Sequence, residues 1–371
     1  MPRPLAVASI LVALASSAVG DGYKAKPAID SHVSYFDVAA RRAELRQTQS
    51  PRVRAALAGL QTCTALPPAG PPQGPMRIPP HYLHGNHGPT NPEEHATTQI
   101  YEKFERRVNA GMNQFLVTAS HPEAQCAQDE IDRWAQANEL VDYDAVENSQ
   151  SWYQTEWTLS SIALSESVLV NDAQLDPHEM ARDIAWMNKV AHRMVGFPSE
   201  SKHTNNHHYW RGLAAIATGV ISSDTGLFNF GVQAYKDAVD DIDQRGALPK
   251  EMARSERSIH YQSFALQPLL PIAEFAERQH VPLYNYTSPT GHTIADAISF
   301  LGEAVADPAI VRAYTPEDQL MDSDSPDFFA AIEFYRRRFP ERKLPPSIAA
   351  DLSKPTSSAR LGGSTTVIAG Q

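Results

Sequence analysis

The feature that most constrains the fold of this 371-residue chain is the helical spacing of its apolar residues from about residue 93 onward. Between residues 97 and 117, apolar side chains recur every three or four positions, at Ile100, Phe104, Val108, Met112, Phe115 and Leu116. The same pattern predicts further helices over 121–141, 152–170, 176–195, 207–222, 226–243, 256–278, 291–306 and 325–338. The alternation of β-branched residues that predicts strands is scarce, so we do not expect a sheet-based core.

These helices favour an all-α fold. Short connections containing Gly, Pro, Asn or Asp join them, and two further helices with a break at Pro51 are expected over 37–62. Short connections make neighbouring helices antiparallel, and no repeat of fixed period indicates a solenoid. We therefore predict a single domain over 21–371, which is an α/α toroid or incomplete barrel of helical hairpins with a central groove, and we expect a monomer.

The N-terminal twenty residues, MPRPLAVASILVALASSAVG, have the pattern of a secretory signal peptide, with a cation, an apolar run and then small residues. We therefore expect a secreted or periplasmic protein, with an N-terminal membrane anchor as the alternative, and no later segment is apolar enough to anchor it in a membrane. In an oxidising compartment Cys63 and Cys126 would form one disulfide, although two buried free thiols are an alternative. Asn285 begins a glycosylation sequon, which matters only in a eukaryotic host.

Residues 64–92 contain nine prolines, and so many missing amide donors and fixed φ angles argue against regular structure there. This segment is either a surface linker or a lid-like binding loop. A binding loop is supported by the aromatic and imidazole side chains of this segment, which are His81, Tyr82, His84 and His87.

The stretch KHTNNHHYWRG, residues 202–212, is the first candidate site. His203 and His207 are four residues apart, which suits zinc, but no glutamate follows His203 in the metalloprotease manner and we predict no metal. A second interpretation is a polar helix start capped by Thr204 or Asn205. In the third, Asn206 and His207 lie at a helix N-terminus, where amide donors and the helix dipole favour an anion.

The second candidate site is EMARSERSIHYQSFALQPLL, residues 251–270. The spacing of Arg254, Arg257 and Tyr261 predicts that they share one face of a helix. Alternatively, Arg257 pairs with a surface glutamate and Tyr261 belongs to the core. The chemical fit with Asn206 and His207 favours a joint site for an anion.

Other functions have weaker support. A net charge of −11 argues against nucleic acid as the partner, but cations gathered in one cleft can still bind an acidic polymer. No serine-hydrolase elbow, P-loop or dinucleotide fingerprint is present. Paired carboxylates for glycoside hydrolysis could come from two acidic clusters, Asp240, Asp241 and Asp243 or Asp322, Asp324 and Asp327.

Taken together, two stretches resemble a known family. NNHHYW (205–210) is followed by LFNFGVQAYKDAVDDIDQRGALPKEMARSERSIHYQSFALQPL (227–269), which contains Arg-x-x-Arg-x-x-x-Tyr before an apolar helix. The pair resembles the secreted and periplasmic alginate lyases that are specific for mannuronate. The resemblance covers most of the chain after residue 60, loosely outside its motifs, and includes QTC at Cys63, the helix around Trp157, and ARLGG at 359–363.

This resemblance implies an α/α toroid that cleaves an acidic polysaccharide, a polyuronate, by β-elimination without a cofactor. Asn206 and His207 match the family's catalytic pair, Arg254 its carboxylate-neutralising arginine, and Tyr261 its proton-transferring tyrosine. Further candidates for substrate binding lie in or near the matched motifs, and these are Gln150, Trp157, Trp210, Arg257, His81, Tyr82 and Arg360. Relatives carry Lys-Tyr where this chain has His81-Tyr82.

The chemistry of β-elimination accounts for these residue types. The C5 proton of a uronate is acidic enough only when the neighbouring carboxylate is neutralised, here by Asn206 and Arg254, with His207 as a third candidate. In β-linked mannuronate the C5 proton and O4 lie on the same side of the ring, so Tyr261 could serve as base and then as acid. Glucuronate differs only at C2, so a glucuronan lyase is the close alternative. A glycoside hydrolase and a non-catalytic polyuronate-binding protein are more distant ones.

Overall fold

The computed structural model describes residues 29–84, 87–197 and 204–371. The predicted signal peptide and His203 therefore lie outside the described residues. The longer helices are α1 (Val38–Gln47), α2 (Pro51–Ala58), α3 (Pro92–Thr118), α4 (His121–Gln136), α5 (Ser149–Leu169), α6 (Pro177–Val195), α7 (Asn206–Ile221), α8 (Thr225–Asp240), α10 (Ser258–Arg278), α11 (Ile294–Ala306) and α12 (Ile332–Arg338). Short helices are α9 (Pro249–Met252), α13 (Pro346–Asp351) and α14 (Thr365–Ala369). Within the described ranges, no helix is long and apolar enough to cross a membrane.

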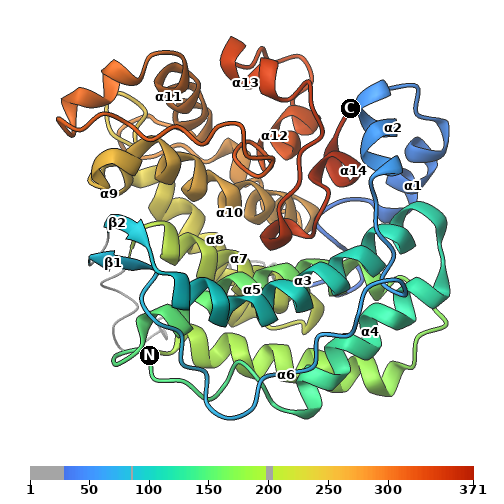
Figure 1. The fold of residues 1–371 in the computed structure, drawn as a ribbon. Coiled ribbons are helices and arrows are strands. Elements are labelled where there is room, and N and C mark those ends of the chain that lie inside the picture. The colour runs from blue at the N-terminus through green and yellow to red at the C-terminus, as the bar shows by residue number, and fades with distance from the viewer. Residues whose placement is uncertain (1–28, 85–86, 198–203) are drawn as a thin grey trace, which may run out of the picture.

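Successive helices form antiparallel hairpins around a common centre (Figure 1). The pairs α3/α4, α5/α6, α7/α8 and α10/α11 pack within themselves, and α3, α5, α7 and α10 also pack one against the next. Every residue of α7 is buried, and so are nearly all residues of α5, because both helices are surrounded by others. The predicted all-α arrangement of helical hairpins is confirmed.

Close packing at the centre depends on two glycines. A Cβ atom on Gly212 of α7 would lie 2.6 Å from the Cβ of Ala234, and one on Gly231 of α8 would lie 2.5 Å from the carbonyl oxygen of Gly212. Both distances are too short for any side chain. The two glycines therefore let α7 and α8 approach closely, which sets the position of the polar N-terminal end of α7.

The proline-rich segment departs from the prediction. Strands β1 (Tyr82–His84) and β2 (His87–Thr90) form an antiparallel hairpin, so the expectation of no regular structure over 64–92 is wrong. Seven of the nine prolines lie between 67 and 80, and the backbone after them is free to pair. Asn91 closes the hairpin, since its backbone N–H donates to the oxygen of His81 at 2.8 Å and its side chain donates to the oxygen of Pro80.

Two predicted helices begin later than expected. The helix predicted over 256–278 begins at Ser258, because Ser255 has a φ of +56° and leaves the helical region. Of the helix predicted over 325–338, only Ile332–Arg338 is α-helical, and turns precede it. The break at Pro51 is confirmed, with Ser50 capping α2 by accepting a hydrogen bond from the backbone of Val53.

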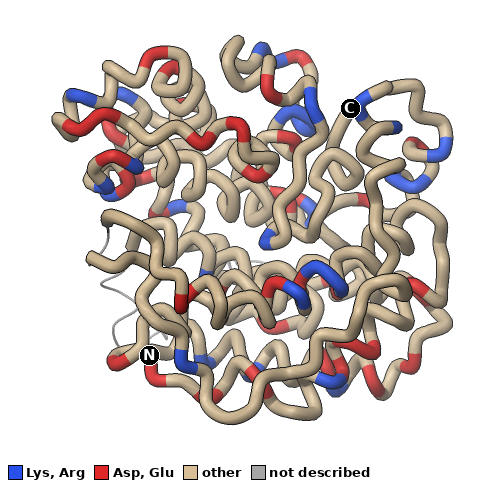
Figure 2. Tube along the Cα trace, in the orientation of Figure 1, with Lys and Arg blue, Asp and Glu red and all other residues tan. Residues whose placement is uncertain are grey.

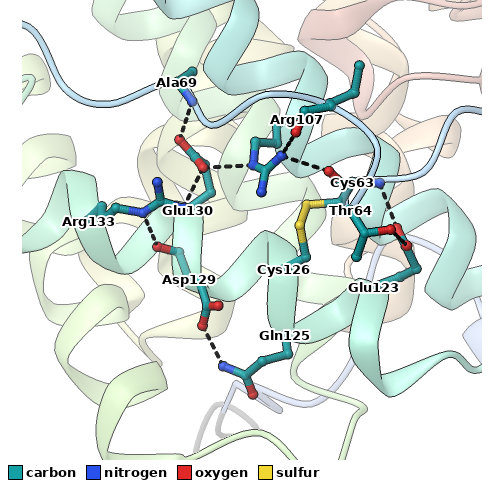
Figure 3. The surroundings of a disulfide bond; sticks show 11 residues. Cys63, Thr64, Ala69, Arg107, Glu123, Gln125, Cys126, Asp129, Glu130 and Arg133 are labelled. Carbon is teal, nitrogen blue, oxygen red and sulfur yellow. Dashed lines mark hydrogen bonds and ion pairs between the residues drawn. A yellow bond between two sulfur atoms is a disulfide. The ribbon is translucent and has the colours of Figure 1, made fainter.

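The predicted disulfide between Cys63 and Cys126 is present and fastens the start of the proline-rich segment to α4 (Figure 3). Arg107 of α3 donates to the oxygen of Cys63 at 2.7 Å and pairs with Glu130 at 2.8 Å. Glu123 accepts from the backbone N–H of Cys63 at 2.6 Å. A cross-link between residues 63 positions apart restricts the unfolded chain and stabilises the fold by about 4 kcal/mol in the chain-entropy model.

Two acidic side chains away from the groove, Glu166 on α5 and Asp183 on α6, are fully buried. Among the described residues, neither oxygen of Glu166 has a hydrogen-bond partner. Burial, and then the charge of Asp183, raises the pKa of Glu166 to about 8. Burial likewise raises the pKa of Asp183 to about 8, although a hydrogen bond from Gln128 opposes the shift. Both groups are therefore protonated in the folded protein at neutral pH.

This pair predicts a loss of stability at alkaline pH. Between about pH 4.5 and 8 the folded protein binds more protons than the unfolded chain, so the free energy of unfolding falls as pH rises through this window. Each group contributes a slope of up to about 1.4 kcal/mol per pH unit. Urea unfolding of Glu166→Gln should show a shallower fall than the wild type, while Glu317→Gln, at an exposed carboxyl, should keep the wild-type slope. An unchanged slope in Glu166→Gln would contradict this assignment.

Candidate active site

A pocket of about 650 Å³ lies where α3, α5, the N-terminal end of α7, the start of α10 and the base of the hairpin meet. Its walls combine acids, cations and aromatic rings from segments far apart in the sequence. They are formed by Ile78, Pro79, Pro80, His81, Tyr82, Glu94, His95, Thr98, Glu102, Glu105, Glu147, Asn148, Ser149, Gln150, Tyr153, Gln154, Trp157, Asn205, His207, Arg254, His260, Tyr261, Phe264, Asp327 and Arg360. Most of the predicted site residues are therefore brought together in one cleft, and the exceptions are Asn206, Trp210 and Arg257.

His207 lies in the first turn of α7, where Asn205 caps the helix and accepts a hydrogen bond from the His207 backbone. Its Nδ1 atom is 2.5 Å from Oε1 of Glu156 on α5. Its ring stacks on Tyr153 with centroids 3.5 Å apart. The other carboxylate oxygen of Glu156 accepts from Arg211 at 3.0 Å. The imidazole is thus held by a buried acid behind it and an aromatic ring beside it.

Asn206 is fully buried and does not line the pocket, unlike its neighbours Asn205 and His207. Its backbone N–H and its side-chain Nδ2 both donate to the carboxyl of Glu251, at 2.6 and 2.8 Å. Burial raises the pKa of Glu251 to about 7, against the opposing effect of these two hydrogen bonds. The Oδ1 atom of Asn206 is buried and has no hydrogen-bond partner in the described part of the chain.

Tyr261 and Arg254 meet in the wall of the same pocket. The Arg254 guanidinium lies 3.9 Å above the centre of the Tyr261 ring, and the Tyr261 hydroxyl is 3.0 Å from the hydroxyl of Tyr82. Burial, and then the neighbouring Tyr261, raises the pKa of Tyr82 above its ordinary value, so Tyr82 stays protonated and can donate to the oxygen of Tyr261. The Nε atom of Arg254 is buried and unpartnered among the described residues, while the residue itself lines the pocket.

The predicted shared helix face is wrong, although two of its three side chains do line one pocket. Arg254 and Arg257 precede α10, on the turn made by Ser255 and the short 3₁₀ helix Ser255–Arg257. Arg257 does not line the pocket. Its guanidinium lies 5.3 Å from the centre of the Tyr82 ring, so it supports the tyrosine pair through a cation–π contact.

An aromatic and cationic platform adjoins these residues, since the Trp157 ring lies 6.0 Å from His207 and the Phe264 ring 6.1 Å from Tyr261. The Arg360 guanidinium, from the 3₁₀ helix Ala359–Leu361, lies 4.7 Å from the Trp157 ring and 5.4 Å from Phe264. Trp210 does not line the groove as predicted. It is fully buried and packs against Phe264 with centroids 5.2 Å apart, because it lies one helical turn further into the packed body of α7.

Near the hairpin, Glu94 of α3 joins two of the predicted substrate-binding residues. It lies 3.1 Å from Nδ1 of His81 and accepts from Gln150 at 3.4 Å. Further along α3, burial raises the pKa of Glu105 to about 7, while a hydrogen bond from Thr158 opposes the shift. Figure 2 shows acidic and basic residues interspersed along α3 and over the periphery rather than separated on two faces.

Sequence reasoning missed the buried acids Glu156, Glu251 and Glu105, and the stacking ring of Tyr153. The available signal was an acid surrounded by uncharged residues, as at Glu156 in SWYQTEWTLSS. No group of three possible metal ligands gathers anywhere in residues 29–84, 87–197 and 204–371. Of the six aspartates considered for glycoside hydrolysis, only Asp327 lines the pocket.

Comparisons with known proteins agree on one family. A family model described as alginate lyase matches residues 28–311. A polysaccharide lyase of Stenotrophomonas maltophilia (strain K279a) is 30% identical over 331 residues, which are 88% of this chain and 96% of that protein. An alginate lyase of Pseudomonas fluorescens (strain SBW25) is 29% identical over 236 residues, 61% of either chain.

Solved structures agree in fold as well. A histidine-to-alanine variant of alginate lyase A1-III, complexed with a tetrasaccharide, superposes with a TM-score of 0.87 at 36% identity, covering 93% of this chain and 97% of that one. Alginate lyase A1-III from Sphingomonas species A1 gives a TM-score of 0.84 at the same identity and covers 92% and 97% of the two chains. This chain therefore belongs to the alginate lyase family, and it is a polysaccharide lyase with an α/α toroid fold.

Proposed function

We propose that this protein cleaves β-1,4-linked polymannuronate by β-elimination and leaves 4,5-unsaturated uronate ends. One observation carries the proposal: the Tyr261 hydroxyl, the Arg254 guanidinium and the His207 imidazole line the same pocket. A tyrosine that can exchange a proton thus lies beside cationic groups that can neutralise a uronate carboxylate.

Charge neutralisation is the first requirement of the reaction. Removing the C5 proton places a second negative charge on the uronate carboxylate, and hydrogen-bond donors that are already in position stabilise this charge. Arg254 offers its guanidinium charge in the pocket wall, and His207 offers its imidazole. Asn206 lies one layer deeper, where Glu251 takes its donors, so we assign it to the support of this wall.

Proton transfer is the second requirement. Tyr261 as phenolate takes the proton from C5, the C4–O4 bond breaks as the C4=C5 double bond forms, and the phenol then returns a proton to O4. The Arg254 charge above the ring and the donated hydrogen bond from Tyr82 both stabilise the phenolate. In mannuronate the two reacting positions lie on one side of the ring, so a single tyrosine serves both steps.

We propose that an acidic oligosaccharide lies along the pocket, in keeping with the tetrasaccharide complex of alginate lyase A1-III. Trp157 and Phe264 form an aromatic part of the wall, and Arg360 over their rings offers a cation to a second carboxylate. His81 and Gln150, which are linked through Glu94, could reach hydroxyl groups. Mannuronate and glucuronate differ at C2, so these last contacts are the candidates for discriminating between the two.

We also propose that the protein is secreted or periplasmic. The residue pattern of the first twenty positions and the disulfide between Cys63 and Cys126 both support a secreted or periplasmic protein. The N-terminal sequence of the mature protein, recovered from medium or periplasm, would test this proposal. A mature protein that retains residues 1–20 in the cytoplasm would overturn it.

The substrate is tested by offering polymannuronate, polyguluronate and glucuronan to the purified protein. The double bond conjugated with the carboxylate absorbs in the ultraviolet, so initial rates of absorbance increase rank the three polymers. We expect the highest rate with polymannuronate. A higher rate with glucuronan would replace this substrate assignment, and no absorbance with any of the three would overturn the proposed function.

A further inference from the structure

The wall behind His207 contains a buried acid that links two helices. Glu156 of α5 is fully buried, and its two oxygens contact two side chains of α7 that are four residues apart. Oε1 lies 2.5 Å from Nδ1 of His207, and Oε2 lies 3.0 Å from Arg211. His207 and Arg211 share one face of α7 because of this spacing, and that face packs on α5.

Arg211 favours the ionised form of Glu156. Its guanidinium is fully buried, lies 4.3 Å from the centre of the Trp152 ring, and forms an ion pair with Glu156. An arginine cannot lose its proton in a protein, and its charge 3.0 Å from Oε2 stabilises the carboxylate form of Glu156. An ionised carboxylate can only accept hydrogen bonds. The contact with Glu156 therefore requires that Nδ1 of His207 carries the hydrogen.

We propose that Glu156 is a positioning residue for the lyase reaction. Glu156 fixes His207 as the tautomer with its hydrogen on Nδ1, so the imidazole gains and loses protons only at Nε2. The inference rests on the proposed function, since His207 is taken to meet the uronate in the pocket. The stack on Tyr153 and the nearby Trp157 ring hold the plane of the imidazole, and Glu156 holds its rotation within that plane.

The arrangement has a mechanistic consequence. A neutral imidazole held in this way presents a lone pair at Nε2, and a protonated one presents an N–H at the same place. His207 can thus change its charge beside the substrate without turning its ring. A neutral histidine free to exchange tautomers would carry its hydrogen on Nε2 part of the time and would then offer no lone pair there.

The direct test is the nitrogen-15 NMR spectrum of the imidazole, which distinguishes a protonated ring nitrogen from an unprotonated one. The signal of His207 is assigned by its loss in His207→Ala. In the wild-type protein we expect Nδ1 to stay protonated across the neutral pH range while only Nε2 titrates. A neutral imidazole with its hydrogen on Nε2 would overturn the inference, and this measurement needs no substrate.

Kinetics of Glu156→Gln supply the second test. The glutamine amide presents a donor towards Arg211 or His207, so Nδ1 of His207 is no longer fixed as the protonated nitrogen, and a misplaced catalytic group costs about 100-fold in kcat. We expect that loss with a much smaller change in KM, and a mixed tautomer in the NMR spectrum. The matched control is Glu130→Gln, which makes the same change at a fully buried glutamate that pairs with Arg107 and Arg133 and does not line the pocket.

Glu130→Gln should lower the stability of the protein yet leave the kcat of the folded protein and the His207 spectrum unchanged. Wild-type kcat in folded Glu156→Gln would overturn the inference, as would an equal loss in both variants. Failure of the proposed function is recognised separately, because it would show as a wild-type protein inactive on every polyuronate.

Discussion

Replacing Tyr261 by phenylalanine is expected to lower kcat on polymannuronate by about 10⁴-fold, the upper end of what one general acid–base group contributes. The loss is large because the same hydroxyl both removes the C5 proton and protonates O4. The phenylalanine ring would still pack beneath Arg254, where the Tyr261 ring now lies 3.9 Å from the guanidinium, so KM should change little. Steady-state rates of unsaturated-product formation give both constants.

The neighbouring hydroxyl provides the comparison for this variant. Tyr82→Phe removes only the hydrogen bond of 3.0 Å to Tyr261, and a bond to a charged oxygen is worth about 1.5–3 kcal/mol, or roughly 10- to 100-fold. We therefore expect Tyr82→Phe to lose much less activity than Tyr261→Phe. A smaller loss in Tyr261→Phe than in Tyr82→Phe would show that Tyr261 is not the proton-transferring group.

The second large effect is expected from Arg254→Ala, with a fall in kcat of about 10²- to 10³-fold, comparable to the loss of one donor to a developing oxyanion. Arg254 lines the pocket directly above the Tyr261 ring, and its loss removes both the donor to the uronate carboxylate and the charge above the phenolate. Because the substrate carboxylate is also charged in the ground state, KM should rise too. Kinetics over a range of polymannuronate concentrations separate the two constants.

Arg257→Ala is the matched control, since the same side chain is removed three residues away. Arg257 is also partly exposed, but it does not line the pocket, and its guanidinium lies 5.3 Å from the centre of the Tyr82 ring. We expect a loss of about tenfold or less, in the range of a cation–π contact of about 0.5–1 kcal/mol. Equal losses in the two variants would mean that overall positive charge, rather than the placement of Arg254, supports the reaction.

The fold could be predicted largely from the sequence because its long helices each bury an apolar face of regular period. The prediction over 176–195 differs from α6 by a single residue, for example. The short hairpin and the exact start of α10 could not be predicted, because each depends on the backbone conformation of a few residues. Strands of three and four residues are too short to show alternation, and the left-handed Ser255 that delays the start of α10 has no special residue type.

The candidate site was predictable where chemistry requires particular residue types at one locus, as at His207, Arg254 and Tyr261. Glu156 and Glu251 were not predictable, since they reach their partners across 51 and 45 residues and only the packing of α5 and α9 against the start of α7 brings them there. Trp210 was misplaced for a related reason: spacing assigns a residue to a helix, but only the neighbouring helices determine which side is open.

Cleavage by β-elimination is tested most directly by the mass of the products formed from a mannuronate oligosaccharide in water enriched in heavy oxygen. Elimination adds no water, so we expect new non-reducing ends that lack one water molecule and products that carry no heavy oxygen from bond cleavage. Products with one heavy oxygen for each bond broken, and without unsaturated ends, would show hydrolysis and rule out elimination.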